Sequence, residues 1–276
     1  MILTNDRGFE MGEFRSIHDL TEWLDTKDVS STFEGRRGLE SLSPESKWAG
    51  VVYDDARELL QSGWSIESEK LNAMLNVADM KAKPMPSQKF GYGVVGFAPV
   101  VPLVLAGVPQ NMLTKVKAIG RDKVITVNKS ISYNCGVSSD EIEKESVKAL
   151  AIVRRLEKVG YAVNLNVVWG VSSRHGGIGT RYLWKVRVKA ANERMNISKV
   201  AFPLVNPAFL RRIMFSVLEK WDGTPDSFTC GYGYPIPDNM TEGMLGKKEI
   251  LLPAFIDRKL SEIRDPAELA NALNIQ

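Results

Sequence analysis

Apolar residues recur at the spacing of one helix face in several parts of the chain. In the first of these segments they follow Ser16, a residue type that often caps a helix N-terminus. Gly63 and Gly160 each follow a segment of this kind, and glycine commonly ends a helix. Helices are therefore predicted at residues 16–24, 54–63, 66–80, 109–116, 138–159, 206–221 and from 265 into the tail.

Short runs of β-branched and aromatic residues alternate with helical segments in the second half of the chain. Residues 124–127 form one such run and residues 161–169 another. Between them, Ser138 and Glu141 have the spacing of a capping box at a helix start. Strand, helix and strand in this order predict a βαβ unit, and hence a parallel strand pair with a right-handed crossover. Residues 230–234 and 249–252 could form two further short strands.

A fifth strand is predicted at residues 181–189, where apolar and basic residues alternate. Successive side chains of a strand point to opposite faces of the sheet, so the two kinds separate. The apolar set is Tyr182, Trp184, Val186 and Val188, and the basic set is Arg181, Lys185, Arg187 and Lys189. We expect the apolar set to pack in the core and the basic set to be exposed, which places this strand at or near an edge of the sheet.

These patterns together predict an α/β fold with a partly parallel central sheet flanked by helices. Residues 1–120 are expected to form a mostly helical or irregular N-terminal region packed on the core, and residues 121–276 the α/β domain. The longest apolar stretch, residues 94–108, is interrupted by Pro99, Pro102 and Gly107, so no membrane-spanning helix is expected. Cys135 and Cys230 are far apart and suggest free thiols in a reduced compartment.

Charge is unevenly distributed along the chain, although the net charge is only +3. Residues 1–70 carry fifteen acidic and eight basic residues, whereas residues 171–220 carry two acidic and ten basic ones. A basic middle suggests either a face for a polyanion or a face covered by the acidic N-terminal segment. The residues predicted to contact nucleic acid are Arg174, His175, Arg181, Lys185, Arg187, Lys189, Arg211 and Arg212.

Motifs for chemistry are few. Gly91, Gly93 and Gly96 match G-x-G-x-x-G, but prolines surround them and no helix start follows, so dinucleotide binding is not expected. His175 follows Ser172 and Ser173 in a glycine-rich loop, and such a pair still needs a third group to orient it for catalysis. No catalytic residue and no cofactor is assigned, and the chain is expected not to be an enzyme.

Asn128, Ser130 and Ser132 form an Asn-x-Ser-x-Ser sequence after a predicted strand. Together with that strand, the long helix and the strand at 163–168, this sequence resembles a von Willebrand factor A-like (vWA-like) domain over roughly residues 120–255. In that family the turn is Asp-x-Ser-x-Ser and binds Mg²⁺. Here the first ligand is a neutral amide, so the turn is a degenerate metal site that should bind Mg²⁺ poorly. A carboxylate from Asp222, Asp226 or Asp238 could complete it, and otherwise the three side chains satisfy local backbone groups.

Four further segments resemble an uncharacterised family of bacteriophage-encoded proteins: residues 48–50, 100–112, 154–165 and 202–215. That resemblance spans most of the chain and implies no established activity. We therefore expect a phage-encoded, non-enzymatic accessory protein in the host cytoplasm. It would bind single-stranded nucleic acid through its basic face and recruit a phage or host polymerase or replication protein. The alternative is a protein–protein adaptor or virion component that uses the vWA-like domain without nucleic acid, and a divalent-metal enzyme is a remote third possibility.

Overall fold

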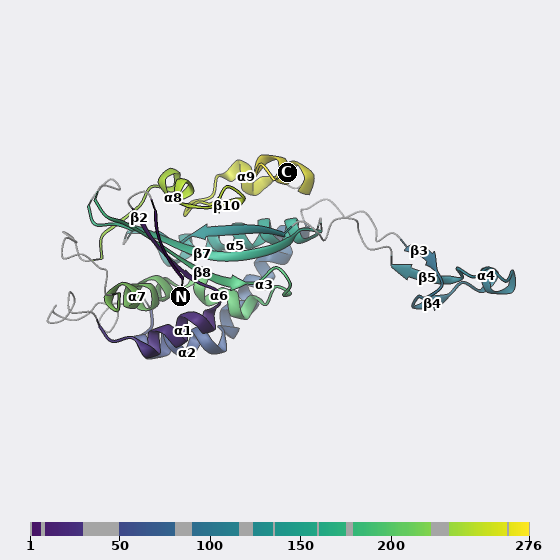
Figure 1. The fold of residues 1–276 in the computed structure, drawn as a ribbon, viewed down its shortest axis with the longest axis horizontal. Coiled ribbons are helices and arrows are strands. Elements are labelled where there is room, and N and C mark those ends of the chain that lie inside the picture. Colours follow the sequence, from purple (N-terminus) through teal and green to yellow (C-terminus); the bar gives the residue numbers. More distant parts are fainter. Residues whose placement is uncertain are drawn as a thin grey trace.

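A computed structural model shows a large α/β body and a separate small lobe (Figure 1). It describes residues 2–6, 9–29, 50–80, 90–115, 124–134, 136–158, 160–174, 179–221, 232–263 and 265–275. Within these ranges, no single helix is both long enough and apolar enough to cross a membrane.

The body is built on one mixed sheet, which confirms the predicted α/β class with a partly parallel sheet. Its strands are β1 (Ile2–Asp6), β2 (Phe9–Phe14), β6 (Val124–Ser130), β7 (Ala162–Ser172), β8 (Arg181–Lys189), β9 (Tyr234–Pro235) and β10 (Glu249–Leu252). The order is β1-β2-β8-β7-β6-β10, with β9 beside the end of β7. The pairs β2–β8, β6–β7 and β6–β10 are parallel, and β1–β2, β7–β8 and β7–β9 are antiparallel.

The predicted βαβ unit is present as β6, helix α5 (Ser139–Lys158) and β7. The capping box at the start of α5 also forms. The backbone N–H of Glu141 donates to the Ser138 hydroxyl, and the N–H of Ser138 donates to the Glu141 carboxylate. These two bonds fix the start of α5, and α5 then returns the chain to a strand beside β6.

Helices cover one face of the sheet and enclose the main core. They are α1 (Ile17–Thr26), α2 (Tyr53–Ser62), α3 (Ser65–Met80), α5, α6 (Ile197–Val205), the π-helix η2 (Phe209–Met214) and α7 (Phe215–Glu219). The predicted single helix at 206–221 is thus a π-helical turn continued by α7. Apolar side chains of the sheet such as Leu165 and Trp184 are fully or almost fully buried against these helices.

The opposite face of the sheet has a smaller apolar cover. Helix α8 (Asp238–Met244) packs there through Met244, with Phe9, Val168 and Leu183 from the strands and Ile236 beside them. Helices α9 (Arg258–Glu262) and α10 (Pro266–Ala272) follow β10 and contact α5. Where α8 does not cover it, this face of the sheet carries polar and charged side chains of β6 and β8, among them the predicted site residues Asn128 and Lys185.

The small lobe is residues 90–115, and it has its own sheet. Strands β3 (Phe90–Gly93), β4 (Ala98–Pro99) and β5 (Met112–Lys115) pair in the order β3-β5-β4, and the short helix α4 (Val101–Leu105) lies between β4 and β5. The helix predicted at 109–116 is wrong, because residues 112–115 form the central strand of this sheet. Gly91 and Gly93 belong to β3 and no helix begins at Gly96, as expected for a chance match to the dinucleotide motif.

Candidate functional site

Strand β8, which carries the predicted basic face, lies inside the sheet. The prediction of an edge strand is wrong, because β2 pairs with β8 on one side and β7 on the other. The pairing with β2 places Glu13 directly beside Lys185. Part of the acidic N-terminal segment is therefore strand β2, and its Glu13 helps to neutralise the positive charge of β8.

Lys185 is buried and paired with two carboxylates. Its ammonium lies 3.0 Å from Oε1 of Glu249 on β10 and 3.6 Å from Oε2 of Glu13. Arg187 lies 3.7 Å from Oε1 of Glu13, with its side chain 31% exposed. Because burial of a lysine is tolerated when its charge is paired, these carboxylates account for the position of Lys185. Lys185 is not positioned to reach a phosphate in solution.

Lys189 is also buried, at 2% exposure. Its ammonium lies 2.7 Å from Glu157 of α5 and donates to the carbonyls of Val163 and Ala190. These bonds join the end of β8 to β7 and to the last turn of α5. The expectation that the basic side of this strand is exposed is therefore wrong for both lysines.

The other predicted cations do not form one surface either. Arg212 is 1% exposed and donates from Nε to the carbonyl of Val51 at 2.9 Å, while the guanidinium of Arg211 lies 4.9 Å from the centre of the Phe215 ring. Arg174 is exposed and Arg181 is half-buried. His175 lies outside the described residues. The seven described residues of this set are thus divided among β8, the helical segment that contains Arg211 and Arg212, and the segment after β7 that contains Arg174.

Asn128 and Ser130 lie within β6, which extends three residues beyond its predicted end, and Ser132 follows it. Their oxygens already have partners. The Asn166 amide donates to Oδ1 of Asn128 at 2.8 Å, and the backbone N–H of Gly170 donates to Oγ of Ser132 at 2.9 Å. The N–H of Ser132 lies 3.4 Å from Oγ of Ser130.

Three carboxylates from later in the chain were possible further ligands of this turn. Among the residues that the structure describes, no three His, Cys, Asp or Glu side chains cluster as metal ligands would. Asp238 begins α8, whereas Asp222 and Asp226 lie outside the described ranges. The arrangement is that of hydrogen bonds between strands, consistent with the role in satisfying local backbone groups that was considered from the sequence.

Lys129, between Asn128 and Ser130, is a functional candidate that sequence reasoning missed. Its side chain is fully buried, and its ammonium donates to the carbonyls of Ser130, Pro253 and Ala254 at 2.7–2.9 Å and to the Tyr133 hydroxyl at 3.1 Å. Burial lowers the pKa of Lys129 to about 7, partly opposed by the negative charges of Glu145 and Asp238. These contacts clamp the end of β6 to the segment after β10, which is a structural role.

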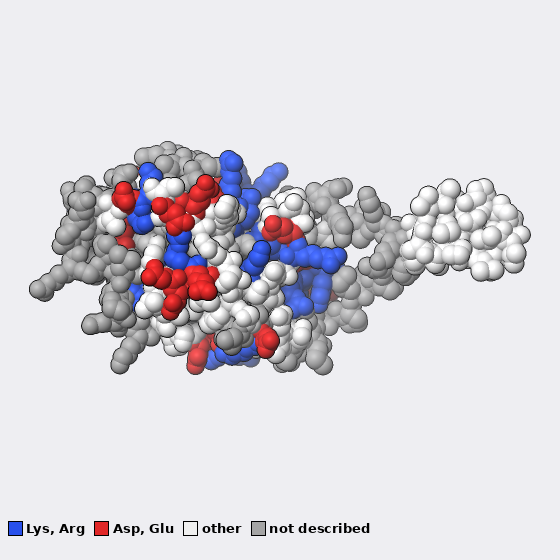
Figure 2. Space-filling model, turned by 90° about the horizontal axis from the view of Figure 1, so that it is seen from below, with Lys and Arg blue, Asp and Glu red and all other residues white. Residues whose placement is uncertain are grey.

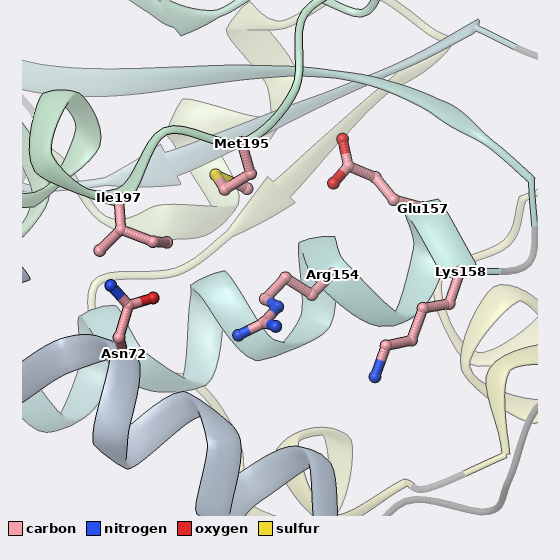
Figure 3. A pocket seen from close by; sticks show the side chains of 6 residues that line it. All are labelled: Asn72, Arg154, Glu157, Lys158, Met195 and Ile197. Carbon is pink, nitrogen blue, oxygen red and sulfur yellow. The ribbon is translucent and has the colours of Figure 1, made fainter. Parts of the chain in front are cut away.

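A pocket of about 340 Å³ lies between α3, α5 and the segment that starts α6 (Figure 3). Its lining residues are Asn72, Arg154, Glu157, Lys158, Met195 and Ile197. In Figure 3 the guanidinium of Arg154 extends toward Asn72, whereas the carboxylate of Glu157 extends toward the side on which Met195 lies. The lining thus includes two basic side chains, Arg154 and Lys158, and one carboxylate, Glu157, which forms an ion pair with Lys189.

The lobe has the most unusual surface of the described residues. Eight of its large apolar side chains are 37–83% exposed: Tyr92, Val94, Val95, Phe97, Val101, Val104, Leu105 and Val108. None of the residues 91–114 is buried, and the sequence from 90 to 114 has no Asp, Glu, Lys or Arg. On the face shown in Figure 2, acidic and basic side chains are intermixed over the body, while the described residues of the lobe show no charged side chain. The unbroken uncharged run was visible in the sequence and would have identified this surface.

Contiguous exposed apolar surface of this kind is rare on a soluble domain and marks contacts with other molecules. Scattered exposed apolar residues are ordinary, and the body has three in its described part: Val52, Val124 and Phe255. The lobe is therefore the strongest candidate site, and the pocket beside α5 is the second.

Comparison with known proteins gives one match. No curated protein and no solved structure matches the chain. The model of a family described as a domain of unknown function, DUF7192, matches residues 11–268. That range includes the lobe and every strand of the main sheet except β1 and the first residues of β2. The chain belongs to the DUF7192 family.

Proposed function

We propose that this protein is a non-enzymatic interaction component, an adaptor whose α/β body holds the lobe at residues 90–115 for contact with another protein. The observation that carries the proposal is the lobe surface, with eight large exposed apolar side chains and no buried side chain among residues 91–114. Full burial of one such side chain contributes about 1.5–3 kcal/mol. A partner that covers several of them gains enough free energy to form a specific complex.

The fold of the lobe supports an interaction role. The sheet of the lobe should be only marginally stable by itself, because none of its residues from 91 to 114 is buried in a core. Its shape is nevertheless specified. A Cβ on Gly96 would lie 2.2 Å from the carbonyl oxygen of Leu113, so glycine is needed for the turn to pack against β5. A defined backbone with an exposed apolar surface is what a docking element requires.

The experiment compares two double variants with the unmodified chain. Val95→Asp with Leu105→Asp places charges on side chains of the lobe that are 82% and 83% exposed. Val52→Asp with Val124→Asp places the same charges on exposed residues of the body. The resemblance to phage-encoded proteins makes infected bacterial cytoplasm the setting for quantitative affinity capture. We expect the amount of captured protein to fall at least tenfold with the lobe variant and to stay the same with the body variant. Equal retention by both variants would contradict the proposal.

Single-stranded nucleic acid remains a second candidate partner, supported by the pocket beside α5. Arg154 and Lys158 line it, and an aliphatic wall formed by Met195 and Ile197 could contact a base. Such binding would be mainly electrostatic, and each lost phosphate contact on a single strand reduces the salt slope by about 0.7.

A salt titration of a fluorescent oligonucleotide tests this candidate. Replacement of Arg154 and Lys158 by Ala should flatten the slope, while replacement of the exposed Lys247 and Lys248 should not. Replacement of Lys185 is unsuitable for this purpose, because its loss would disturb the core of the sheet. An unchanged slope in the pocket variant would remove the pocket from consideration.

A further inference from the structure

We infer that residues 253–263 form a releasable strap and that the surface beneath it is a second docking site, which takes an extended peptide of a partner protein. The strap follows β10, includes α9 and lies along α5. Figure 1 shows it in yellow at one margin of the body. The inference goes beyond the proposed function and does not depend on it, because the strap and the lobe are separate surfaces.

The start of the strap is held through its main chain. The ammonium of Lys129 donates to the carbonyls of Pro253 and Ala254, both at 2.9 Å, and the hydroxyl of Tyr133 donates to the carbonyl of Ala254 at 3.3 Å. Lys129 lies in β6, and Tyr133 follows that strand. None of these bonds involves a side chain of the strap, so this end of the surface recognises carbonyl groups and not a particular residue type.

Helix α5 holds the rest of the strap in the same way. Glu145, Lys148 and Arg155 are separated by three and seven residues, which places them on one face of the helix. Glu145 accepts a hydrogen bond from the N–H of Ile256 at 2.7 Å, and Lys148 donates to the carbonyl of Ile256 at 3.4 Å. Arg155 donates to two carbonyls at the end of α9, at 2.8 and 3.0 Å. The helix thus presents donors and an acceptor to a main chain that runs along it.

Little apolar surface attaches the strap to the body. Of residues 253–263, only Ala254 and Ile256 are buried, and α9 has no buried residue. Phe255, between the two buried residues, is 53% exposed. In β7, by contrast, all but two residues are buried. Because a segment opens at lower cost when few apolar side chains leave the core, the strap should open while the sheet stays closed.

The face of α5 beneath the strap is suited to water and to a second main chain. Glu145 and Arg155 are charged side chains that only the strap covers on this face, and they regain hydration when it opens. The opened surface offers the same donors and acceptor to another chain. A partner that fits is an extended segment with aliphatic side chains two positions apart, as Ala254 and Ile256 are, since alternate side chains of an extended chain point the same way.

The strap competes with such a partner. A tethered segment is present at a high effective concentration, and the apparent affinity for a second peptide falls in proportion to the fraction of molecules whose strap is open. A substitution that loosens the strap but leaves the surface intact therefore strengthens the binding of an added peptide, whereas a substitution in the surface weakens it. A contact that only stabilises the fold would show neither effect.

The first measurement is native-state amide exchange of the unmodified chain at low urea concentrations. The N–H groups of Ile256 and Ser261 are hydrogen-bonded, to Glu145 and to the carbonyl of Asp257, so their exchange reports the opening of the strap. We expect their protection factors to be at least 100-fold lower than those in β7. Equal protection of the strap and β7 would overturn the inference, because the strap would then open only with the whole body.

The second measurement is the binding of a fluorescent peptide with the sequence of residues 253–263, acetylated and amidated so that it has no terminal charges. The full-length chain with Ile256→Ala should bind it at least tenfold more tightly than the unmodified chain, since its own strap has lost one of its two buried side chains. Addition of Arg155→Met should reverse this gain. Lys259→Ala is the control, because this strap side chain is exposed and its loss should leave the affinity unchanged.

Urea unfolding checks that each variant folds, since Ile256 packs against the main core. If Ile256→Ala does not fold, the exchange of the unmodified chain decides the question. No gain in affinity from a folded Ile256→Ala chain, or a gain that Arg155→Met leaves in place, would overturn the inference. Val95→Asp with Leu105→Asp should not change the binding of the peptide, so a failure of the proposed lobe function and a failure of the strap inference are distinguishable.

Discussion

Lys185 on β8 and Glu249 on β10 form an ion pair of 3.0 Å across the face of the two strands, β7 and β6, that separate them. The same carboxylate accepts a hydrogen bond from the amide of Asn128 at 3.1 Å. Glu249 thereby connects the edge strand β10 to the strand that was predicted to bind polyanions. The positive charge of Lys185 is thus neutralised by carboxylates of the protein itself.

The first prediction is that Glu249→Gln destabilises the fold. The substitution keeps the size of the side chain but leaves buried Lys185 with only the more distant Glu13, so a loss of about 2 kcal/mol in the free energy of unfolding is expected. Urea denaturation measures it. Glu262→Gln is the control, because its pair with Arg258 is fully exposed and should contribute nothing measurable. Equal stability of both variants would show that the buried pair is unimportant.

The second prediction concerns the pH dependence caused by Lys129. Its pKa is about 7 in the folded state and has the ordinary value of 10.5 in the unfolded chain. Between these values the unfolded state binds the extra proton, so this group makes the protein more stable as the pH rises from about 7 toward 10.5. Below pH 7 the lysine is charged in both states and contributes no slope.

Urea unfolding of the unmodified chain and of Lys129→Met between pH 7 and 9.5 tests this. The difference in unfolding free energy should move in favour of the unmodified chain by up to about 1.4 kcal/mol per pH unit. Measurements should stop below pH 10, because burial raises the pKa of Tyr133 and of Tyr182, which makes the folded state less stable once tyrosines ionise in the unfolded chain. A pH-independent difference would mean that Lys129 keeps an ordinary pKa.

The third prediction separates the lobe from the body. Gly96→Ala places a methyl group 2.2 Å from the Leu113 carbonyl oxygen, so the turn before β4 cannot pack against β5. Amide exchange in residues 90–115 should increase at least tenfold, while exchange in β6 and β7 stays the same. Gly243→Ala is the control, since no atom beyond its chain neighbours and the backbone of its own helix lies within 4 Å of the added methyl group. Faster exchange in the body would show that the lobe contributes to its stability.

The fourth prediction is that Mg²⁺ does not stabilise the protein. Oδ1 of Asn128 and Oγ of Ser132 accept hydrogen bonds from Asn166 and Gly170, so coordination of a cation would require these bonds to break. The melting temperature should be the same with and without millimolar Mg²⁺. An upward shift that disappears in Ser130→Ala would instead demonstrate a metal site at the end of β6.

Local sequence patterns predicted the elements that depend on short-range physics. The capping box at Ser138 and Glu141, the alternation of β8 and the crossover from β6 to β7 are all present, because each is determined by neighbouring residues or by a common chirality rule. The position of β8 was not predictable in this way. It depends on pairing with β2, about 170 residues earlier, and no local signal encodes such a partner.

The same limit explains the errors in the candidate site. Alternation correctly placed Lys185 and Lys189 on one side of β8, but their exposure depends on Glu13, Glu157 and Glu249, which come from three distant segments. The exposed apolar surface of the lobe, in contrast, could have been predicted from composition. Glycines and prolines keep this uncharged run from forming a long helix or strand that could pack its apolar side chains into the core. Its sequence patterns suggested only a membrane span and a dinucleotide motif, neither of which was expected to form, and a helix at residues 109–116.

The parallel pairing of β2 with β8 has a consequence for biosynthesis. A ribosome completes Phe14 long before it reaches Lys189, and at 5–20 residues per second the delay is roughly 10–35 s. During that interval β2 can pair with β1, but its other neighbour, β8, has not yet been synthesised. The carboxylate of Glu13 therefore still lacks Lys185, its partner in the folded protein. Closure of the sheet on that side is thus a late event, and a chaperone that holds the emerging N-terminal hairpin would act in this interval.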